Sequence, residues 1–206
     1  GINWAISNHV AGVPAVLNLS LGGTLSSNLN TAVRNAIADG IVVVVAAGNN
    51  SLNACNYSPA SERSAITVGA STSNDARATF SNTGTCLDMF APGQSITSTW
   101  LNGVTNTISG TSMAAPHVAG AVARYLQTAT VTSTTPTAAW NWLKTNATCN
   151  AITYYTSSTT DTSRVSLAKT PNRLLAIDAP ASVPCAPNSV TATVASESSV
   201  VTWDEV

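Results

Sequence analysis

Charged residues are scarce in this chain. Only 8% of its 206 residues are Asp, Glu, Lys or Arg, which is low for a globular domain. The formal net charge is −1, and no cluster of Lys and Arg occurs anywhere along the sequence. We therefore expect no basic patch, and with it no binding of nucleic acid or of an anionic membrane surface.

Long apolar runs and leader sequences are missing as well. The longest apolar run, IVVVVAA at residues 41–47, is far too short to span a bilayer. The chain opens on GINWAISNHV, which has neither an initiator Met nor the basic start of a signal peptide. This opening is typical of the middle of a helix, so we expect the sequence to be a fragment or a processed product.

Cysteine is present four times, but never as a CxxC pair, which disfavours a zinc ribbon or a thioredoxin motif. An even number of spaced cysteines in a charge-poor chain predicts two disulfides and an oxidising compartment. Buried free thiols are the alternative. The four residues are Cys55, Cys86, Cys149 and Cys185.

Short apolar runs alternate with helical patterns, and this predicts an α/β fold. An apolar run at 15–23 is followed by a helical pattern at 26–40 and by a β-branched run at 41–50. Two strands joined by a helix within some 30 residues form a crossover and therefore run parallel. Further short strands are expected at 65–70 and 86–92.

The stretch GTSMAAPHVAG at residues 110–120 carries the first candidate for chemistry. A helical pattern of small residues starts at Ser112, so this helix can approach a sheet closely and lie at the centre of the fold. At such a loop-to-helix junction, the backbone N–H of Ser112 and the positive helix end can stabilise a developing oxyanion. Ser112 is thus a candidate nucleophile, while a simple helix N-cap is the alternative.

Two glycine-rich segments end the first pair of predicted parallel strands, SLGG at 20–23 and AAGNN at 46–50. Ligands bind at the carboxyl ends of the strands in open α/β sheets, so these segments can form the walls of a groove. The side-chain amide of Asn49 can then join the N–H of Ser112 in an oxyanion hole. A turn residue after Gly48 is the alternative interpretation of Asn49.

The motifs NLSLGG, VVAAGNN, NYSPAS, TVGAS, FSNTG, FAPG, SGTSMAAPHVAG and PNRLL occur here in the order seen in subtilisin-like serine proteases. The chain most resembles the proteinase K and aqualysin-like branch, over about Gly1 to Ile177. The resemblance implies an incomplete subtilisin-like α/β fold, with a parallel sheet and helices on both faces. It implies that residues 1–178 are the C-terminal portion of a catalytic domain.

The resemblance also assigns site residues. It implies that Ser112 is the nucleophile and Asn49 the side-chain oxyanion donor of a secreted endopeptidase. The remaining residues implied to bind substrate are of two kinds, an edge that pairs with an extended peptide and the wall of an apolar pocket for the side chain before the scissile bond. The edge is formed by Ser20, Leu21 and Gly22, the pocket by Ala46, Ala47 and Gly48, and Thr111 belongs to the same set.

One departure from the family pattern is severe. The catalytic order in the family is Asp, His, Ser, and neither a DSG-like nor an HGTH-like segment occurs here. A triad of His9, Asp39 or Asp88, and Ser112 would have the order of a β-barrel protease, which the parallel α/β pattern disfavours. His117 lies in the family's helix motif and is expected to be structural. We expect the chain alone to be inactive, because losing the base of such a triad costs many orders of magnitude.

Three functional classes remain open on the sequence. The first is a broad-specificity endopeptidase that prefers large apolar side chains before the scissile bond. It would act on polypeptides as a monomer, without a catalytic cofactor, and mature from a precursor with an N-terminal propeptide. The second is a pseudoprotease or binding module that holds peptides without cleaving them. The third, an inert adhesion module, leaves the Ser112 motif unexplained.

Aqualysin-like relatives have cysteines in places that match Cys55 and Cys86, so the resemblance implies this pair, which leaves Cys149 with Cys185. The resemblance further implies a structural calcium ion, held by the Asp88 carboxylate and by the main-chain carbonyls of Arg63 and Ala65. A salt bridge from Asp88 to Arg63 or Arg77, or an exposed strand end, is the alternative.

The sequence changes character near its C-terminal end. Residues 179–188 are proline-rich and are expected to be a linker. Alternating apolar residues at 189–206 are typical of the start of a small β-sandwich and weakly resemble a fibronectin type III domain. A plain linker followed by any small β domain is the alternative.

Overall fold

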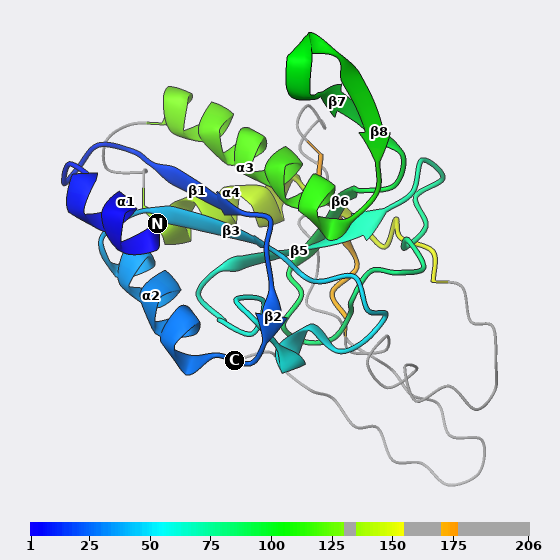
Figure 1. The fold of residues 1–206 in the computed structure, drawn as a ribbon, viewed down its shortest axis with the longest axis horizontal. Helices are drawn as coiled ribbons and strands as arrows, with labels where there is room; N and C mark the ends of the chain where they lie inside the picture. The colour runs from blue at the N-terminus through cyan, green and yellow to red at the C-terminus, as the bar shows by residue number, and fades with distance from the viewer. Residues whose placement is uncertain (130–134, 155–169, 177–206) are drawn as a thin grey trace, which may run out of the picture.

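The computed structural model of the protein describes residues 1–129, 135–154 and 170–176, and its centre is a six-stranded sheet (Figure 1). The order is β1-β3-β5-β6-β10-β9, and all neighbours are parallel except β10 and β9. The predicted parallel sheet is therefore confirmed, with one antiparallel edge strand that was not expected. The strands are β1 (Val16–Leu19), β3 (Val42–Ala46), β5 (Ile66–Ser71), β6 (Met89–Pro92), β9 (Thr148–Cys149) and β10 (Arg173–Leu174).

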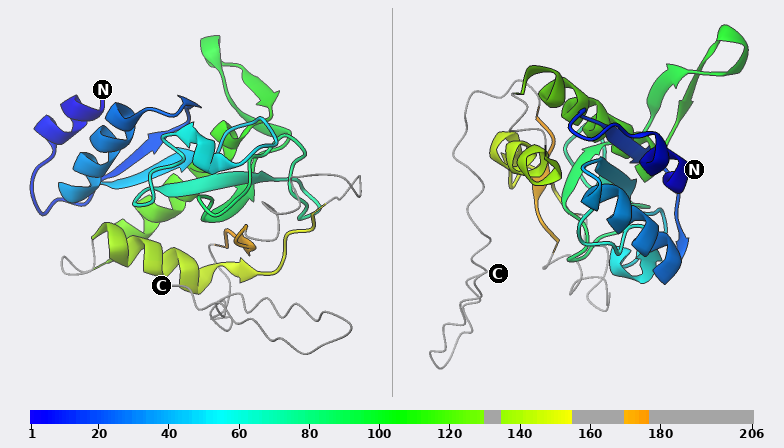
Figure 2. Two further views of the ribbon diagram at one scale, coloured as in Figure 1. Left: turned by 90° about the horizontal axis from the view of Figure 1, so that it is seen from below. Right: turned by 90° about the vertical axis from the view of Figure 1, so that its left-hand side faces the viewer.

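Helices cover both faces of this sheet, as predicted (Figure 2). In β3, Val42 and Val44 pack with the helices α3 and α4, whereas Val43 and Val45 pack on the face of α1 and α2. Every residue of β3 is buried, which explains why its sequence is apolar without alternation. The helices are α1 (Ile2–Asn8), α2 (Ser27–Ala38), α3 (Thr111–Thr128) and α4 (Pro136–Asn146).

The central helix α3 owes its place to small side chains. Ala114, Ala115 and Val118 are fully buried in the core that α3 shares with β3, β5 and β6. Short side chains let the helix axis approach the sheet closely, and α3 contacts β1, β3, β5 and β6 in turn. The first turn of α3 is thereby brought beside the carboxyl ends of β1 and β3.

Local signals explain how the chain enters α2. The N–H of Leu29 donates to the Ser26 hydroxyl, which caps the start of the helix. Val33 and Ala36 bury one helix face against the sheet. Gly40 follows the helix with a φ of +101°, a left-handed conformation that favours glycine, and lets the chain turn directly into β3.

Two small sheets and two short 3₁₀ helices, Ala54–Asn56 and Leu101–Gly103, complete the described fold. The antiparallel pair of β2 (Gly23–Thr24) and β4 (Tyr57–Ser58) closes one side of the site described below. The hairpin of β7 (Ile96–Thr99) and β8 (Thr105–Ile108) projects from the body of the molecule (Figures 1 and 2). Sequence patterns predicted neither sheet, because short polar strands show no apolar period.

Cys55 and Cys86 form a disulfide, which confirms that predicted pair. Cys149 is disulfide-bonded as well. Its predicted partner Cys185 lies outside the described residues, as do the predicted linker at 179–188 and the predicted β domain at 189–206. Those remain predictions. Among the described helices, none combines the length and the apolar character needed to cross a membrane.

Candidate active site

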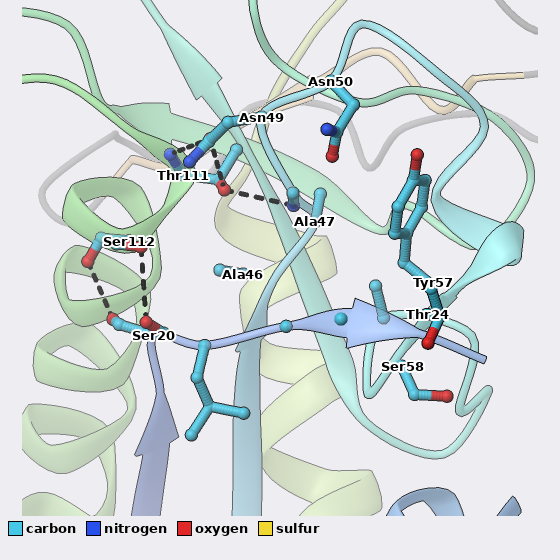
Figure 3. Close-up of a pocket in the computed structure, with 15 residues that line it drawn as sticks. Ser20, Thr24, Ala46, Ala47, Asn49, Asn50, Tyr57, Ser58, Thr111 and Ser112 are labelled. Atoms are coloured by element: carbon cyan, nitrogen blue, oxygen red, sulfur yellow. Dashed lines mark hydrogen bonds between the residues drawn. The ribbon is translucent and has the colours of Figure 1, made fainter. Parts of the chain in front are cut away.

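A cavity of about 450 Å³ opens at the carboxyl ends of β1 and β3 (Figure 3). Its walls come from the segment after β1, the segment after β3, the β2–β4 pair and the first turn of α3. Every residue assigned above to the nucleophile, the oxyanion hole or substrate binding lines this one cavity. These residues are Ser20, Leu21, Gly22, Ala46, Ala47, Gly48, Asn49, Thr111 and Ser112.

Ser112 is the second residue of α3, and it is not the N-cap. The N-cap is Gly110, and no side chain caps this helix end, so the alternative interpretation of Ser112 is wrong. The Ser112 hydroxyl donates to the Ser20 carbonyl at 3.3 Å, and the Ser20 hydroxyl donates to the Ser112 carbonyl at 2.7 Å. In the first turn of a helix, the N–H of Ser112 has no intrahelical acceptor and remains available to a ligand.

Asn49 lies in the bend after β3, and Thr111 fixes the orientation of its amide (Figure 3). The Asn49 Oδ1 accepts from both the N–H and the hydroxyl of Thr111, each at 2.8 Å. The Thr111 hydroxyl in turn accepts from the N–H of Gly48 at 3.1 Å. With Oδ1 held in this way, the Nδ2 group is left as a donor, and no described residue accepts a hydrogen bond from it.

The loop that carries Asn49 is held by Asn82, a buried residue of the FSNTG motif to which no role was assigned from the sequence. Its Oδ1 accepts from the N–H groups of Asn50 and Leu52 at 3.0 Å, and its Nδ2 donates to the Ala47 carbonyl at 2.9 Å. Gly48 has a φ of +100°, and a Cβ there would lie 2.4 Å from the Asn82 Nδ2. Both the conformation and the space therefore require glycine.

Further lining residues were missed because they reach the cavity through long-range strand pairing. Thr24 and Tyr57 face each other in the β2–β4 pair, and Ser58 and Ala60 follow. The motif NYSPAS contains three of these positions, but only the fold brings it opposite the segment after β1. Tyr57 adds the aromatic side chain to a cavity whose lining is otherwise made up of small residues, Leu21 and two asparagines (Figure 3).

Neither of the two histidines lines the cavity. His9 precedes β1, so it lies at the opposite end of that strand from Ser20. Its Nδ1 contacts the Asp39 carboxylate at 2.7 Å, and its Nε2 contacts the Val13 carbonyl at 2.7 Å. The alternative triad of His9, Asp39 or Asp88, and Ser112 is therefore wrong, because His9 lies away from Ser112 in either version. His117 contacts the Met113 carbonyl through Nδ1 at 2.8 Å, within its own helix.

Two acceptors face the His9 ring, and this has an electrostatic consequence. A neutral imidazole has only one N–H, so the protonated ring satisfies both contacts better. The Val13 carbonyl and the Asp39 carboxylate accordingly raise the pKa of His9 above its usual 6.5. His9 thus holds its proton more tightly than a free imidazole does, as part of a structural tie between the end of α1 and the end of α2.

Asp88 precedes β6, is half-buried, and accepts from the Thr67 N–H at 2.7 Å. Burial raises the pKa of this carboxyl to about 7, although the Thr67 N–H and nearby cations act in the opposite direction. Within the described ranges Asp88 forms no salt bridge, and Arg63 donates to the Thr85 carbonyl. The described residues contain no cluster of His, Cys, Asp and Glu side chains suited to a metal ion.

The model of the Subtilase family, peptidase S8, matches residues 1–170 of this chain. The chain belongs to the subtilase family. Relatives of this subtilase include an "Extracellular serine proteinase" of Thermus sp. strain Rt41A, which is 64% identical over 129 residues. That match covers 62% of this chain and 31% of the relative. "Alkaline serine exoprotease A" of Vibrio alginolyticus is 53% identical over 127 residues, covering 62% and 23% of the two chains.

A solved structure has the same fold as this subtilase. It is described as a cold adapted subtilisin-like serine proteinase, is 42% identical and superposes with a TM-score of 0.74. The superposition covers 87% of this chain and 60% of that one. The chain therefore spans about a third or less of the curated relatives' length and three-fifths of a solved subtilase. The predicted α/β subtilisin-like fold is confirmed.

Proposed function

We propose that the protein to which this chain belongs is a secreted subtilisin-like serine endopeptidase, and that this chain carries its nucleophile and its oxyanion hole. Family membership supports serine peptidase chemistry, and the relatives named above include an extracellular proteinase. The polypeptide substrate and maturation from a precursor with an N-terminal propeptide form part of the same proposal. We also propose that the protein acts as a monomer and needs no catalytic cofactor.

One observation carries the proposal, namely that Asn49 and the N–H of Ser112 supply two donors at one cavity. The Ser112 hydroxyl oxygen attacks the scissile carbonyl carbon, and the carbonyl oxygen becomes an anion. The Ser112 N–H and the Asn49 Nδ2 donate to that anion, while the positive end of α3 adds to the same field. Because Thr111 and Gly48 already fix the Asn49 amide, little reorganisation is needed as charge develops.

The proton that leaves the Ser112 hydroxyl needs a base, and no histidine among the described residues lines the cavity. His9 and His117 have other partners, and neither lines the cavity. We infer that the Asp and His of the triad belong to a part of the protein outside this chain, in the family order. Ser112 alone is then nearly inert, because the triad residues act as a unit.

The shape of the cavity supports a preference for a large apolar side chain before the scissile bond. Ala46, Ala47, Gly48 and Ala60 leave space in the wall, and Tyr57 offers an aromatic face. The main chain at Ser20–Gly22 supports pairing with an extended peptide strand, as in other cases of strand addition.

A structural calcium ion at Asp88 is the metal part of the proposal. The Asp88 carboxylate lacks a salt-bridge partner within the described residues, and its raised pKa reflects a negative charge that protein surroundings disfavour. A hard cation would stabilise that charge, with the main-chain carbonyls of Arg63 and Ala65 as further oxygen ligands. Its role would be to brace the start of β5, and it would take no part in bond cleavage.

Proteolysis assays and the upstream coding sequence test the proposed function together. We expect DSG-like and HGTH-like segments upstream of Gly1, and cleavage of a denatured protein by the full-length product. The product should cut a peptide with Phe before the scissile bond faster than the matched peptide with Gly. A full-length protein that binds such peptides without cutting them, and that has no upstream His, would instead establish a binding module.

A further inference from the structure

The helix that carries Ser112 contains a proline four residues further on. In an α-helix the carbonyl of residue i accepts from the N–H of residue i+4, which for Ser112 is position 116. Pro116 has no N–H, so the usual partner of the Ser112 carbonyl is missing. The carbonyl next to the nucleophile therefore needs a donor from outside the helix.

Ser20 provides that donor. Its hydroxyl donates to the Ser112 carbonyl at 2.7 Å, the shorter of the two bonds between these residues (Figure 3). The Ser20 hydroxyl also accepts from the Asn18 Nδ2 at 3.0 Å. Asn18, Ser20 and Ser112 thus form a directed chain of hydrogen bonds, in which each bond polarises the next.

We propose that the side chain of Ser20 is a positioning residue for the Ser112 nucleophile. This inference rests on the proposed function, and it concerns the hydroxyl of Ser20, not its main chain. The same residue accepts the hydrogen bond of the Ser112 hydroxyl through its carbonyl at 3.3 Å. The hydroxyl and the carbonyl of Ser112 are thereby both held by Ser20. Ser20 begins the segment after β1 that is proposed to bind substrate.

The physical consequence is a fixed distance between nucleophile and substrate. A peptide that pairs with Ser20–Gly22 is placed relative to β1, and the Ser20 hydroxyl places the first turn of α3 relative to the same strand. Removing that hydroxyl leaves the substrate edge intact but lets the first turn of α3 shift. Small misplacements of reacting atoms lower the rate of the chemical step much more than they weaken substrate binding.

The first test is Ser20→Ala in the full-length protein, with kcat and KM measured on a peptide anilide. We expect kcat to fall about 5- to 10-fold, the value of one neutral hydrogen bond. KM should stay within about twofold, because an interaction that acts on the chemical step leaves ground-state binding unchanged. Ser20→Thr keeps the hydroxyl and should recover most of kcat. Ser98→Ala, on the exposed hairpin strand β7, is the matched control.

The second test is a double-mutant cycle with Pro116→Ala. Alanine restores an N–H at position 116, which can satisfy the Ser112 carbonyl within the helix. In the Pro116→Ala background, Ser20→Ala should therefore lower kcat by less than about twofold, and the two substitutions should be non-additive. The Tm of the four proteins gives a second readout, in which Ser20→Ala lowers Tm less once Pro116 is replaced.

The outcomes separate this inference from the proposed function. Non-additive effects on both kcat and Tm support the positioning role. Non-additivity in Tm alone, with kcat unchanged by Ser20→Ala, shows a structural bond and overturns it. Additive effects on both also overturn it. A wild-type full-length protein that neither cleaves peptides nor reacts at Ser112 overturns the proposed function itself, and the positioning role with it.

Discussion

Thr111 determines which end of the Asn49 amide faces the cavity. Its N–H and hydroxyl both donate to the Asn49 oxygen, so the amide cannot present that oxygen to a substrate anion. A single residue thus fixes the donor and also precedes the nucleophile in sequence. The proposed oxyanion hole therefore depends on Thr111 as well as on Asn49, since Asn49 supplies the donor and Thr111 orients it.

The first prediction concerns Asn49 and Thr111. Asn49→Ala removes one oxyanion donor, for which subtilisin is the reference case with a loss of about 10²- to 10³-fold in kcat. Thr111→Val removes one donor to Asn49 and also the acceptor of the Gly48 N–H, and kcat should fall about 10-fold. Thr111→Ser should retain kcat. Steady-state kinetics of the full-length protein measures these effects, with Asn74→Ala in an exposed loop as control.

The oxyanion role of Asn49 would be contradicted by an unchanged kcat in Asn49→Ala. A rise in KM at constant kcat would assign Asn49 to substrate binding instead.

The second prediction concerns Asp88 and calcium. The pKa of Asp88 in the folded protein is raised from 3.8 to about 7, so the folded state holds this proton more tightly than the unfolded state. The resulting stability is fully present below the unfolded pKa and is lost as the pH rises through about 7. Without calcium, the Tm of the full-length protein should fall across that range, and Asp88→Asn should reduce the fall.

Added calcium should reverse the effect of Asp88→Asn on Tm. The substitution should protect Tm at high pH without calcium, and lower it when calcium is present. At pH 8 calcium should raise the Tm of the wild type, and Asp88→Asn should abolish most of that rise. Asp75→Asn is the matched control, since Asp75 is exposed and has a φ of 54°, which asparagine tolerates. An equal rise in Tm for wild type and Asp88→Asn would exclude Asp88 as a ligand.

Single residues divide clearly into those that sequence could assign and those that it could not. Ser112 and Asn49 follow glycine-rich or small-residue signals at strand ends, so their place at one cavity was predictable. Asn82 and Tyr57 reach the site through long-range contacts, from the loop after β5 and from β4. Both lie in motifs of the family resemblance, FSNTG and NYSPAS, but nothing in their immediate neighbours encodes the contacts that bring them to the site.

At the scale of elements, α1 is tied to α2 mainly through packing and through His9. The ring of His9 is held between the Val13 carbonyl and the carboxylate of Asp39, the C-cap residue that follows α2. Asp39 is the charged group that acts on this ring, among the described residues. These contacts of His9 fix the segment that leads into β1. The other end of β1 leads to Ser20.

The third prediction is that the pKa of His9 is raised, and that the stability of the folded protein therefore falls as the pH rises. The pKa of His9 in the folded protein lies above 6.5. The contribution of the His9 contacts to stability is therefore fully present below the pKa of the unfolded state, and it is lost as the pH rises through the pKa of the folded state. Proton NMR should find the His9 pKa above 6.5, and Asp39→Asn should lower it. The Tm of Asp39→Asn should accordingly depend less on pH between about 6 and 8.

His117 is the internal control for the effect of Asp39→Asn. Asp39→Asn should leave the His117 resonances unchanged, since His117 contacts the Met113 carbonyl within α3, away from α1 and α2. A His9 pKa at or below 6.5 in the wild type would show that the tie does not hold in solution.

Elements with a strong apolar period were predicted well, and those without one were missed. The helices α2 and α3 and the strands β3 and β5 carry long or fully apolar patterns and lie where expected. The hairpin strands β7 and β8 consist mainly of Thr, Ser and Asn, and project from the body of the protein. Such strands are specified by cross-strand pairing and not by burial, so an apolar period could not reveal them.

At the scale of the whole molecule, one described disulfide links loops on either side of β5. Cys55 follows the segment that carries Asn49, and Cys86 precedes β6. The bond closes a loop with a sequence separation of 31 residues, which includes β5. It therefore restricts the unfolded chain near the proposed oxyanion loop.

The fourth prediction is the cost of removing this disulfide. Replacing both Cys55 and Cys86 with Ser should lower the free energy of unfolding by about 3–4 kcal/mol in the loop-entropy account. Thermal melts of the full-length protein should show a lower Tm, with kcat at low temperature little changed. A Tm equal to that of the wild type would show that this cross-link does not stabilise the fold.

The overall architecture was predictable because a crossover fixes the direction of neighbouring strands. The βαβ pattern of β1, α2 and β3 determined the parallel sheet, and the order of motifs gave the family. Strand order was not readable from the same patterns, since β10 follows α4 in sequence but pairs with β6. The antiparallel edge strand β9 was missed for the same reason.

The central claim is that Ser112 becomes a nucleophile when the complete catalytic unit is present. The direct measurement is labelling of the full-length protein with a fluorophosphonate, followed by mapping of the labelled peptide by mass spectrometry. The account predicts one label, on Ser112, which Ser112→Ala abolishes and Asn49→Ala slows, while the isolated chain of residues 1–206 stays unlabelled. An active full-length protein that is labelled at another residue, or not at all, would contradict the account.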